Sequence, residues 1–249
     1  RHGVEVWTVS QAVAYWLGGV EPVSAQDWLG LAEQRLLALT AGAVFHDDAG
    51  ELTALRRRLA WFPRDVWLYK LASQWRRIAE EQAFVGRAGF AGDDLGSRII
   101  AARLARDVMR LAFLIEGCYA PYPKWFGSAF SRLACAHQLS PVLAQVLAAD
   151  DWKSREALLA EVYLAVGRLQ IAMGIPGARA PTIGPYHGRP FSVINADEIA
   201  SRIREQIADG QLRALPLVGS LDQVTDATPV VEAPANARAA IRAFFDAGD

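Results

Sequence analysis

Two long segments of this sequence would each form a helix with one narrow polar stripe on an otherwise apolar surface. In the segment 66–84, the residues at helical spacing on that stripe are Lys70, Ser73, Gln74, Arg77 and Glu81. In the segment 94–118, the corresponding residues are Arg103, Arg106, Asp107 and Arg110. A helix with so much apolar surface is largely buried, so each charge must be paired or must reach water in a cleft.

The remaining pattern predicts a mainly α fold. A third long helix is expected over 152–173, and the three long helices should form the core of a helical bundle. Residues 4–9 alternate apolar and polar and predict a short N-terminal β element. Residues 191–194 indicate another short strand, and the segment 176–190 is rich in Gly and Pro, as in a linker or a binding loop.

The helix boundaries and the domains follow from the turn signals. Ser140 followed by Pro141 is typical of a helix start, and the pattern weakens beyond residue 215 into a loop-rich C-terminal segment. We therefore expect two parts. Residues 1–50 would hold the β element and connecting helices, and residues 51–249 would form a helical domain with an acidic C-terminal extension.

Composition excludes several classes of protein. The chain has 249 residues with 52% hydrophobic residues, which excludes a disordered chain. The net charge of −1 argues against nucleic acid as a partner. No apolar run is long enough to cross a membrane, and the two cysteines, Cys118 and Cys135, fit buried thiols of a cytoplasmic protein. The sequence does not indicate an oligomeric state.

The polar stripes leave two interpretations open. Either they face solvent or pair with one another through Glu81 and Asp107, or they line a cleft that holds a phosphate-bearing or polar ligand. Three arginines on one face of the 94–118 helix need anions between them, which a ligand or the acidic tail would supply. The candidate ligand-binding residues on the stripes are Lys70, Gln74, Arg77, Arg103, Arg106 and Arg110.

An aromatic loop over 119–127 adds two candidates. Lys124 stands at a helix start, where backbone N–H groups also attract anions, and Tyr122 belongs to the rigid aromatic wall beside it. Simple packing of a helix connection explains the loop equally well. His187 and Arg189, from the Gly- and Pro-rich segment, complete the predicted binding set. No His pair has metal-ligand spacing, so we predict no metal site.

Several runs together resemble an uncharacterised bacterial helical family, a domain of unknown function that follows a minimal nucleotidyltransferase-like domain. The runs that carry the resemblance are Asp65 to Tyr69, Gln74 to Ile78, Phe84 to Arg87, Gly92 to Arg98, Tyr119 to Gly127, His187 to Phe191 and Gly219 to Gln223. The resemblance implies membership of the nucleotidyltransferase superfamily and an α-helical substrate-binding portion. The predicted N-terminal β element of this chain would then be a remnant of the nucleotidyltransferase-like sheet.

Nucleotidyltransferases hold two divalent metals with carboxylates, and members of that superfamily place an acidic-x-acidic pair after Gly-Ser. This sequence has no such pair, because Gly219 and Ser220 are followed by Asp222 and Asp226. Glu5 resembles the third carboxylate of the family, and Glu81 is a candidate base. Whether the chain is an enzyme is left open, and Mg²⁺ and a nucleoside triphosphate are expected only if a catalytic domain precedes it.

Three functional hypotheses follow. The first is a nucleotidyltransferase-like protein whose helical part binds a nucleotide or a small phosphorylated acceptor. The second is a non-catalytic helical module that binds a ligand or a partner. The third is a helical ribonuclease, since Arg132 and His137 have the spacing of its motif, although Leu133 occupies a position that is usually polar.

Overall fold

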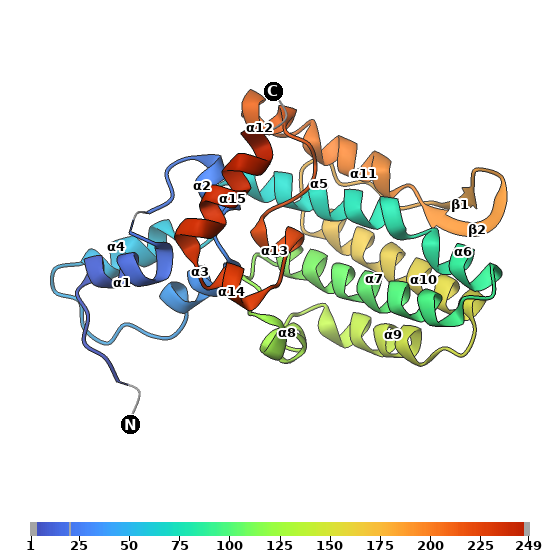
Figure 1. Ribbon diagram of the computed structural model, residues 1–249, viewed down its shortest axis with the longest axis horizontal. Helices are drawn as coiled ribbons and strands as arrows, with labels where there is room; N and C mark the ends of the chain where they lie inside the picture. The colour runs from blue at the N-terminus through green and yellow to red at the C-terminus, as the bar shows by residue number, and fades with distance from the viewer. Residues whose placement is uncertain (1–3, 20, 247–249) are drawn as a thin grey trace.

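The computed structural model describes residues 4–19 and 21–246, apart from the side chains of 244 and 246. Its N-terminal half contains α1 (Val9–Leu17), α2 (Ala25–Leu29), α3 (Glu33–Thr40), α4 (Glu51–Arg58), α5 (Arg64–Glu81), α6 (Phe84–Phe90) and α7 (Asp94–Ile115). Its C-terminal half contains α8 (Pro123–Phe130), α9 (Ala136–Ala148), α10 (Trp152–Ala172), β1 (Ile183–Tyr186), β2 (Arg189–Ile194), α11 (Ala196–Arg204), α12 (Gly210–Ala214), α13 (Leu221–Val224), α14 (Thr228–Val231) and α15 (Pro234–Asp246). The fold is mainly α, as predicted (Figure 1).

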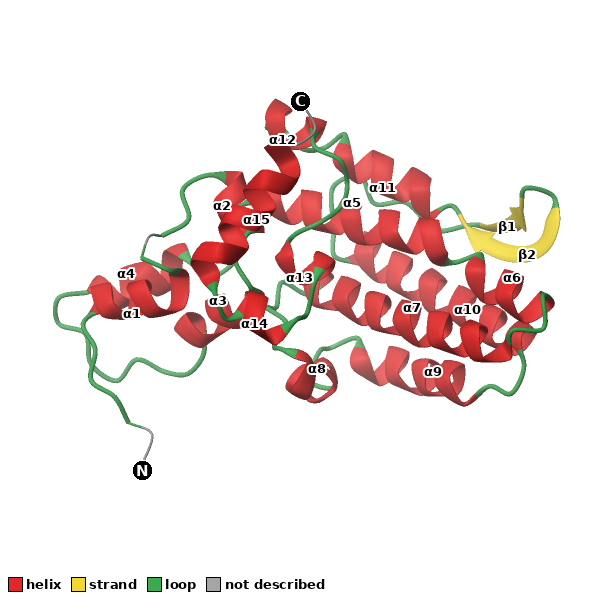
Figure 2. Ribbon diagram, in the orientation of Figure 1, coloured by secondary structure: helices red, strands yellow, loops and turns green. Residues whose placement is uncertain are grey.

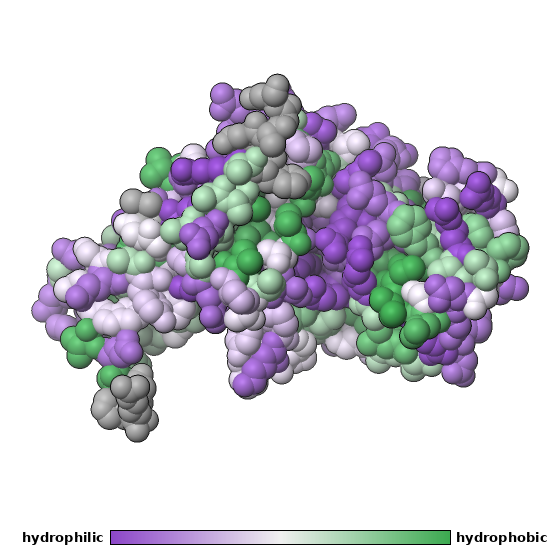
Figure 3. Space-filling model, in the orientation of Figure 1, coloured by the Kyte–Doolittle hydropathy of each residue, from purple (hydrophilic) through white to green (hydrophobic). Residues whose placement is uncertain are grey.

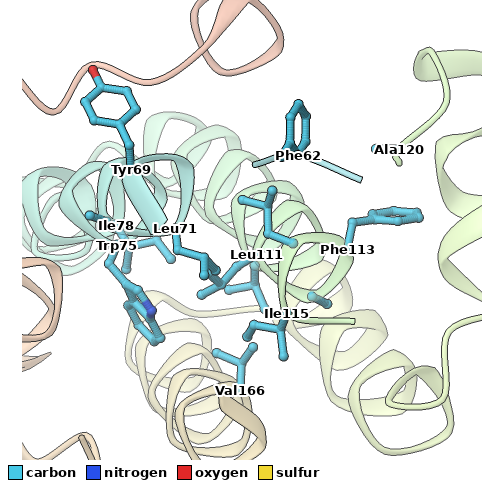
Figure 4. Packing of buried hydrophobic residues seen from close by; sticks show 14 of the residues in the cluster. Phe62, Tyr69, Leu71, Trp75, Ile78, Leu111, Phe113, Ile115, Ala120 and Val166 are labelled. Carbon is cyan, nitrogen blue, oxygen red and sulfur yellow. The ribbon is translucent and has the colours of Figure 1, made fainter. Parts of the chain in front are cut away.

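The three predicted long helices form the centre of the bundle. Helix α7 packs against both α5 and α10, α11 covers α5, and α9 lies along α10. Figure 4 shows Leu71 and Trp75 of α5, Leu111 of α7 and Val166 of α10 pointing toward one another. All four side chains are fully buried, which is the burial that the apolar faces predict.

The two ends of the chain pack together. Helix α15 packs on α2 and α1, from the other end of the chain, as well as on its sequence neighbour α14 (Figure 1). One apolar cluster includes Leu17 of α1, Leu71 of α5 and Ile241 of α15. It therefore joins residues on both sides of the predicted boundary at 50, and the division into two domains stays a prediction.

The predicted N-terminal strand is wrong. Residues 4–8 form no regular element, and Val9 begins α1. The cause is a capping box, in which the N–H of Gln11 donates to Thr8 Oγ1 at 3.1 Å and the N–H of Thr8 donates to Gln11 Oε1 at 2.8 Å. Among residues 4–19 and 21–246, the strands are β1 and β2 alone (Figure 2), so the segment at 4–9 has no described strand to pair with.

The short β element lies instead at 183–194. β1 pairs antiparallel with β2, with Ile183 opposite Ile194, which confirms the predicted strand at 191–194. The turn places His187 at φ 47° and Gly188 at φ 72°. Two consecutive positive φ values are what a tight two-residue hairpin turn requires.

Two further predictions need correction. Pro141 lies inside α9, which begins at Ala136, so Ser140 does not start a helix. Cys118 is exposed because it follows the end of α7, whereas Cys135 is buried.

Within the described part of the chain, no helix combines the length and apolarity needed to cross a bilayer. Figure 3 shows an apolar area where α6 meets the start of α7, and Phe90, Leu95 and Ile99 are exposed there.

Candidate functional site

The polar stripe of α5 faces the protein interior. Lys70 is fully buried, and its Nζ lies 2.9 Å from Glu33 Oε1 and 2.7 Å from Ser220 Oγ. Glu33 Oε2 accepts the N–H of Ala120 at 2.7 Å, and the N–H of Glu33 donates to Asp222 Oδ2 at 2.9 Å. These contacts bind α5 to α3 and to the segment that carries α13.

The α13 segment also fills the space between the two stripes. Gln223 Nε2 donates to Gln74 Oε1 at 3.0 Å, and Gln74 Nε2 donates to Asp107 Oδ1 at 3.1 Å. Arg77 Nε lies 3.0 Å from Asp107 Oδ2, and Arg77 Nη1 donates to the carbonyl of Gln223 at 2.8 Å. The two helices are therefore connected by a continuous hydrogen-bonded network rather than by an open cleft.

The stripe arginines of α7 have partners from other elements. Arg103 pairs with Glu81 at the end of α5, and Arg106 Nη2 lies 2.8 Å from Asp226 Oδ2. Arg110 is buried, with its guanidinium 5.6 Å from the centre of the Phe126 ring. Direct contacts thus support the interpretation that the stripe charges pair with groups of the protein itself. Ligand binding by these residues stays a prediction.

Asp222 lies next to this network, where its Oδ2 accepts the N–H of Glu33. Burial raises the pKa of its carboxyl group, and the charge of Glu33 raises it further, whereas Lys70 and Arg110 act in the opposite direction. Asp226 pairs with Arg106 of the α7 stripe, and Asp222 lies within the electrostatic influence of Arg110. Both acids come from the C-terminal segment, as one alternative in the sequence analysis expected.

The predicted catalytic carboxylates lie far apart. Glu5 is exposed in the segment before α1, whereas Glu81 is the last residue of α5, at the opposite end of the molecule (Figure 1). His187 and Arg189 are exposed at the hairpin, also distant from α1. Among the residues that the structure describes, no three His, Cys, Asp or Glu side chains gather closely enough to hold a metal ion.

The aromatic loop leads to a different site. Lys124 is exposed, and its Nζ lies 5.1 Å from the centre of the Trp125 ring. The N–H of Tyr122 donates to Gln34 Oε1 at 3.0 Å. Tyr122 and Gln34 both border a cavity of about 880 Å³ where α1, α3, the start of α8 and the α14–α15 connection meet.

This cavity is lined by aromatic, small and neutral polar residues with two charged ones. The described lining residues are Ala14, Tyr15, Trp16, Gly18, Gln34, Arg35, Tyr122, Pro123, Thr228, Val231, Glu232, Ala233, Pro234, Ala235 and Asn236. Only Tyr122 of this set was predicted as a site residue. The others are missed because they come from four separate segments, and nothing in the sequence indicates that these segments meet.

Arg35 is the buried cation of the cavity, with 9% of its surface exposed. It donates hydrogen bonds to the backbone carbonyls of Tyr15 at 2.9 Å, of Val231 at 3.3 Å and of Glu232. Its guanidinium carbon lies 5.9 Å from the ring centre of Tyr15 and 5.6 Å from that of Trp16. Within the described residues, no carboxylate forms an ion pair with Arg35.

Comparison with known protein families gives a match for one region of the chain. Residues 28–126 match the model of a family described as a domain of unknown function, DUF4037. The match includes α3, α5 and α7 and ends inside α8. Neither the search of curated proteins nor the search of solved structures gave a significant match. The family match is consistent with the resemblance to an uncharacterised helical family.

Proposed function

We propose that this chain is the helical ligand-binding portion of a nucleotidyltransferase-like protein of bacterial origin, and that it binds a small polar or anionic molecule in the cavity beside Arg35. The observation that carries the proposal is a buried guanidinium without a carboxylate partner, facing a cavity of about 880 Å³. That volume lies within the usual range for small-molecule sites, about 300 to 1,000 Å³.

The chemistry of Arg35 supports an anionic group in the ligand. A guanidinium has five N–H donors, and three carbonyls accept from Arg35. Carbonyl dipoles satisfy donors but do not neutralise the charge, and a buried charge is costly unless it is paired. A ligand carboxylate or phosphate would accept the remaining N–H groups and supply the counter-charge.

The nucleotidyltransferase part of the proposal rests on the resemblance, and the alternative is a non-catalytic binding module. That module would bind a ligand or a partner, and in both cases this chain contains no acidic-x-acidic metal pair. With Mg²⁺ and each nucleoside triphosphate, the chain alone should therefore transfer no nucleotidyl group. Transfer that disappears in Glu5→Ala would show that the residue belongs to a metal site after all.

The binding proposal is tested by thermal shift at fixed ionic strength. The panel contains nucleotides, pyrophosphate, sulfate and small carboxylates, because a ligand that binds only the folded state raises the Tm. We expect at least one of them to stabilise the parent, and Arg35→Gln to abolish that response. The matched control is Arg106→Gln, which removes a half-buried arginine of the α7 stripe and should leave the response intact.

Two results would contradict the proposal. If Arg106→Gln loses the response and Arg35→Gln keeps it, the ligand binds at the arginine stripe instead. If no member of the panel shifts the transition, the cavity binds no small anion. Because Arg35 also connects α1 to the segment after α14, Tyr122→Ala serves as a second variant, since Tyr122 is 37% exposed and its removal should weaken binding without unfolding the protein.

A further inference from the structure

The two charged residues of the cavity have opposite signs. Of the described residues that line it, Arg35 is the cation and Glu232 the anion, and the remainder are neutral. The net charge of the lining is therefore close to zero. A polyphosphate would bring several negative charges to one guanidinium and would meet a carboxylate as well, which is unfavourable at short range.

The two charges are held near each other by the backbone. Arg35 Nη2 donates to the carbonyl of Glu232 itself, so both residues belong to the same wall of the cavity. Glu232 is exposed, and within the described part of the chain its carboxylate forms no ion pair. The cavity thus presents a donor group for an anion and, adjacent to it, a carboxylate that is available to a cation.

Aromatic rings line the same cavity as this pair of charges. Tyr15 and Trp16 meet edge to face, with ring centres 5.0 Å apart, and both line the cavity. Tyr122 also lines it, and 57% of Tyr15 remains exposed. Exposed aromatic faces gain most from a flat apolar group, which can stack or meet them edge to face.

We infer that the cavity binds a zwitterion of the amino-acid type with a planar side chain. Its carboxylate would be bound by Arg35, its ammonium group by Glu232, and its ring by Tyr15, Trp16 and Tyr122. This inference rests on the proposed function and names the ligand class of the same site. Gln34 and Asn236 also line the cavity and offer neutral donors and acceptors to the backbone-like end of such a ligand.

Isothermal titration calorimetry with three matched compounds tests the inference. L-Phenylalanine carries both charges, 3-phenylpropionate carries only the carboxylate, and 2-phenylethylamine carries only the ammonium group. We expect phenylalanine to bind at least about tenfold more tightly than either of the others, because each lacks one charge-assisted contact. Glu232→Gln should weaken phenylalanine binding by about the same factor and leave 3-phenylpropionate binding unchanged.

Two controls separate this inference from the proposed function. Glu161→Gln removes an exposed carboxylate on α10, outside the cavity, and should bind phenylalanine like the parent. If 3-phenylpropionate or phosphate binds as tightly as phenylalanine and Glu232→Gln has no effect, while Arg35→Gln still abolishes binding, the zwitterion is wrong and the anion site stands. If none of the compounds binds and the anion panel also fails, both proposals are overturned.

Discussion

Replacing Lys70 with Met should strongly destabilise the protein. The ammonium group of Lys70 lies 2.9 Å from Glu33 Oε1 and 2.7 Å from Ser220 Oγ, and only 2% of Glu33 is exposed. Met has a similar volume but no charge, so the substitution leaves the Glu33 carboxylate buried with the N–H of Ala120 as its remaining direct partner. Removing one partner of a buried ion pair typically costs about 3–5 kcal/mol. That is a large part of the 5–15 kcal/mol that stabilises an average domain.

The assay is urea unfolding followed by circular dichroism, with a matched control on the same helix. Glu80→Gln breaks the exposed pair between Arg76 and Glu80, and should change the free energy of unfolding by no more than about 0.5 kcal/mol. The double variant Lys70→Met with Glu33→Leu removes both buried charges and should recover part of the loss. The single variant Glu33→Leu is measured as well. If Lys70→Met costs no more free energy of unfolding than Glu80→Gln, or if the loss in the double variant equals the sum of the losses in Lys70→Met and Glu33→Leu, the buried pair does not stabilise the fold as we argue.

Two further perturbations follow from packing and burial. Burial raises the pKa of Glu156 above its ordinary 4.5, so the folded state retains its proton longer than the unfolded state does. The contribution of Glu156 to stability should therefore be fully present below pH 4.5 and be lost as the pH rises through its folded pKa, and Glu156→Gln should remove this contribution when parent and variant are compared in urea titrations at several pH values. A Cβ at Gly89 would overlap the side chain of Trp152, whereas a Cβ at Gly127 would meet open space. Gly89→Ala should then lower the free energy of unfolding by about 1–3 kcal/mol and Gly127→Ala should raise it by up to about 1 kcal/mol. Equal effects of the two substitutions would contradict the packing argument.

The long helices could be predicted because their sequence periodicity coincides with their burial. The expected helices at 66–84 and 94–118 correspond to α5 at Arg64–Glu81 and α7 at Asp94–Ile115. The segment 4–9 has the alternation of a strand, but a strand also needs a partner, and the capping box at Thr8 starts a helix instead. Periodicity alone carries no information about which segments pair.

Most residues of the candidate site could not be predicted from the sequence, for a related reason. Arg35 bonds to carbonyls of Tyr15 and Val231, which lie 20 and 196 positions away in the chain. Backbone carbonyls are present at every position, so no residue type at Val231 indicates that an arginine will bind there. By contrast, the two stripes that contain Arg77 and Arg106 were visible in the sequence, because side chains on one face of each helix recur at fixed spacing.

The position of α13 between α5 and α7 has a consequence for the order in which the molecule is built during synthesis. Lys70 leaves the ribosome about 150 residues before Ser220, its hydrogen-bond partner. The apolar faces of α5, α7 and α10 can meet as soon as they emerge, but the groove between the first two helices then exposes an incomplete polar network to water. The segment that carries α13 therefore completes the protein interior and is not only a surface element. A nascent chain arrested before residue 216 should be more sensitive to proteases along α5 than the released protein.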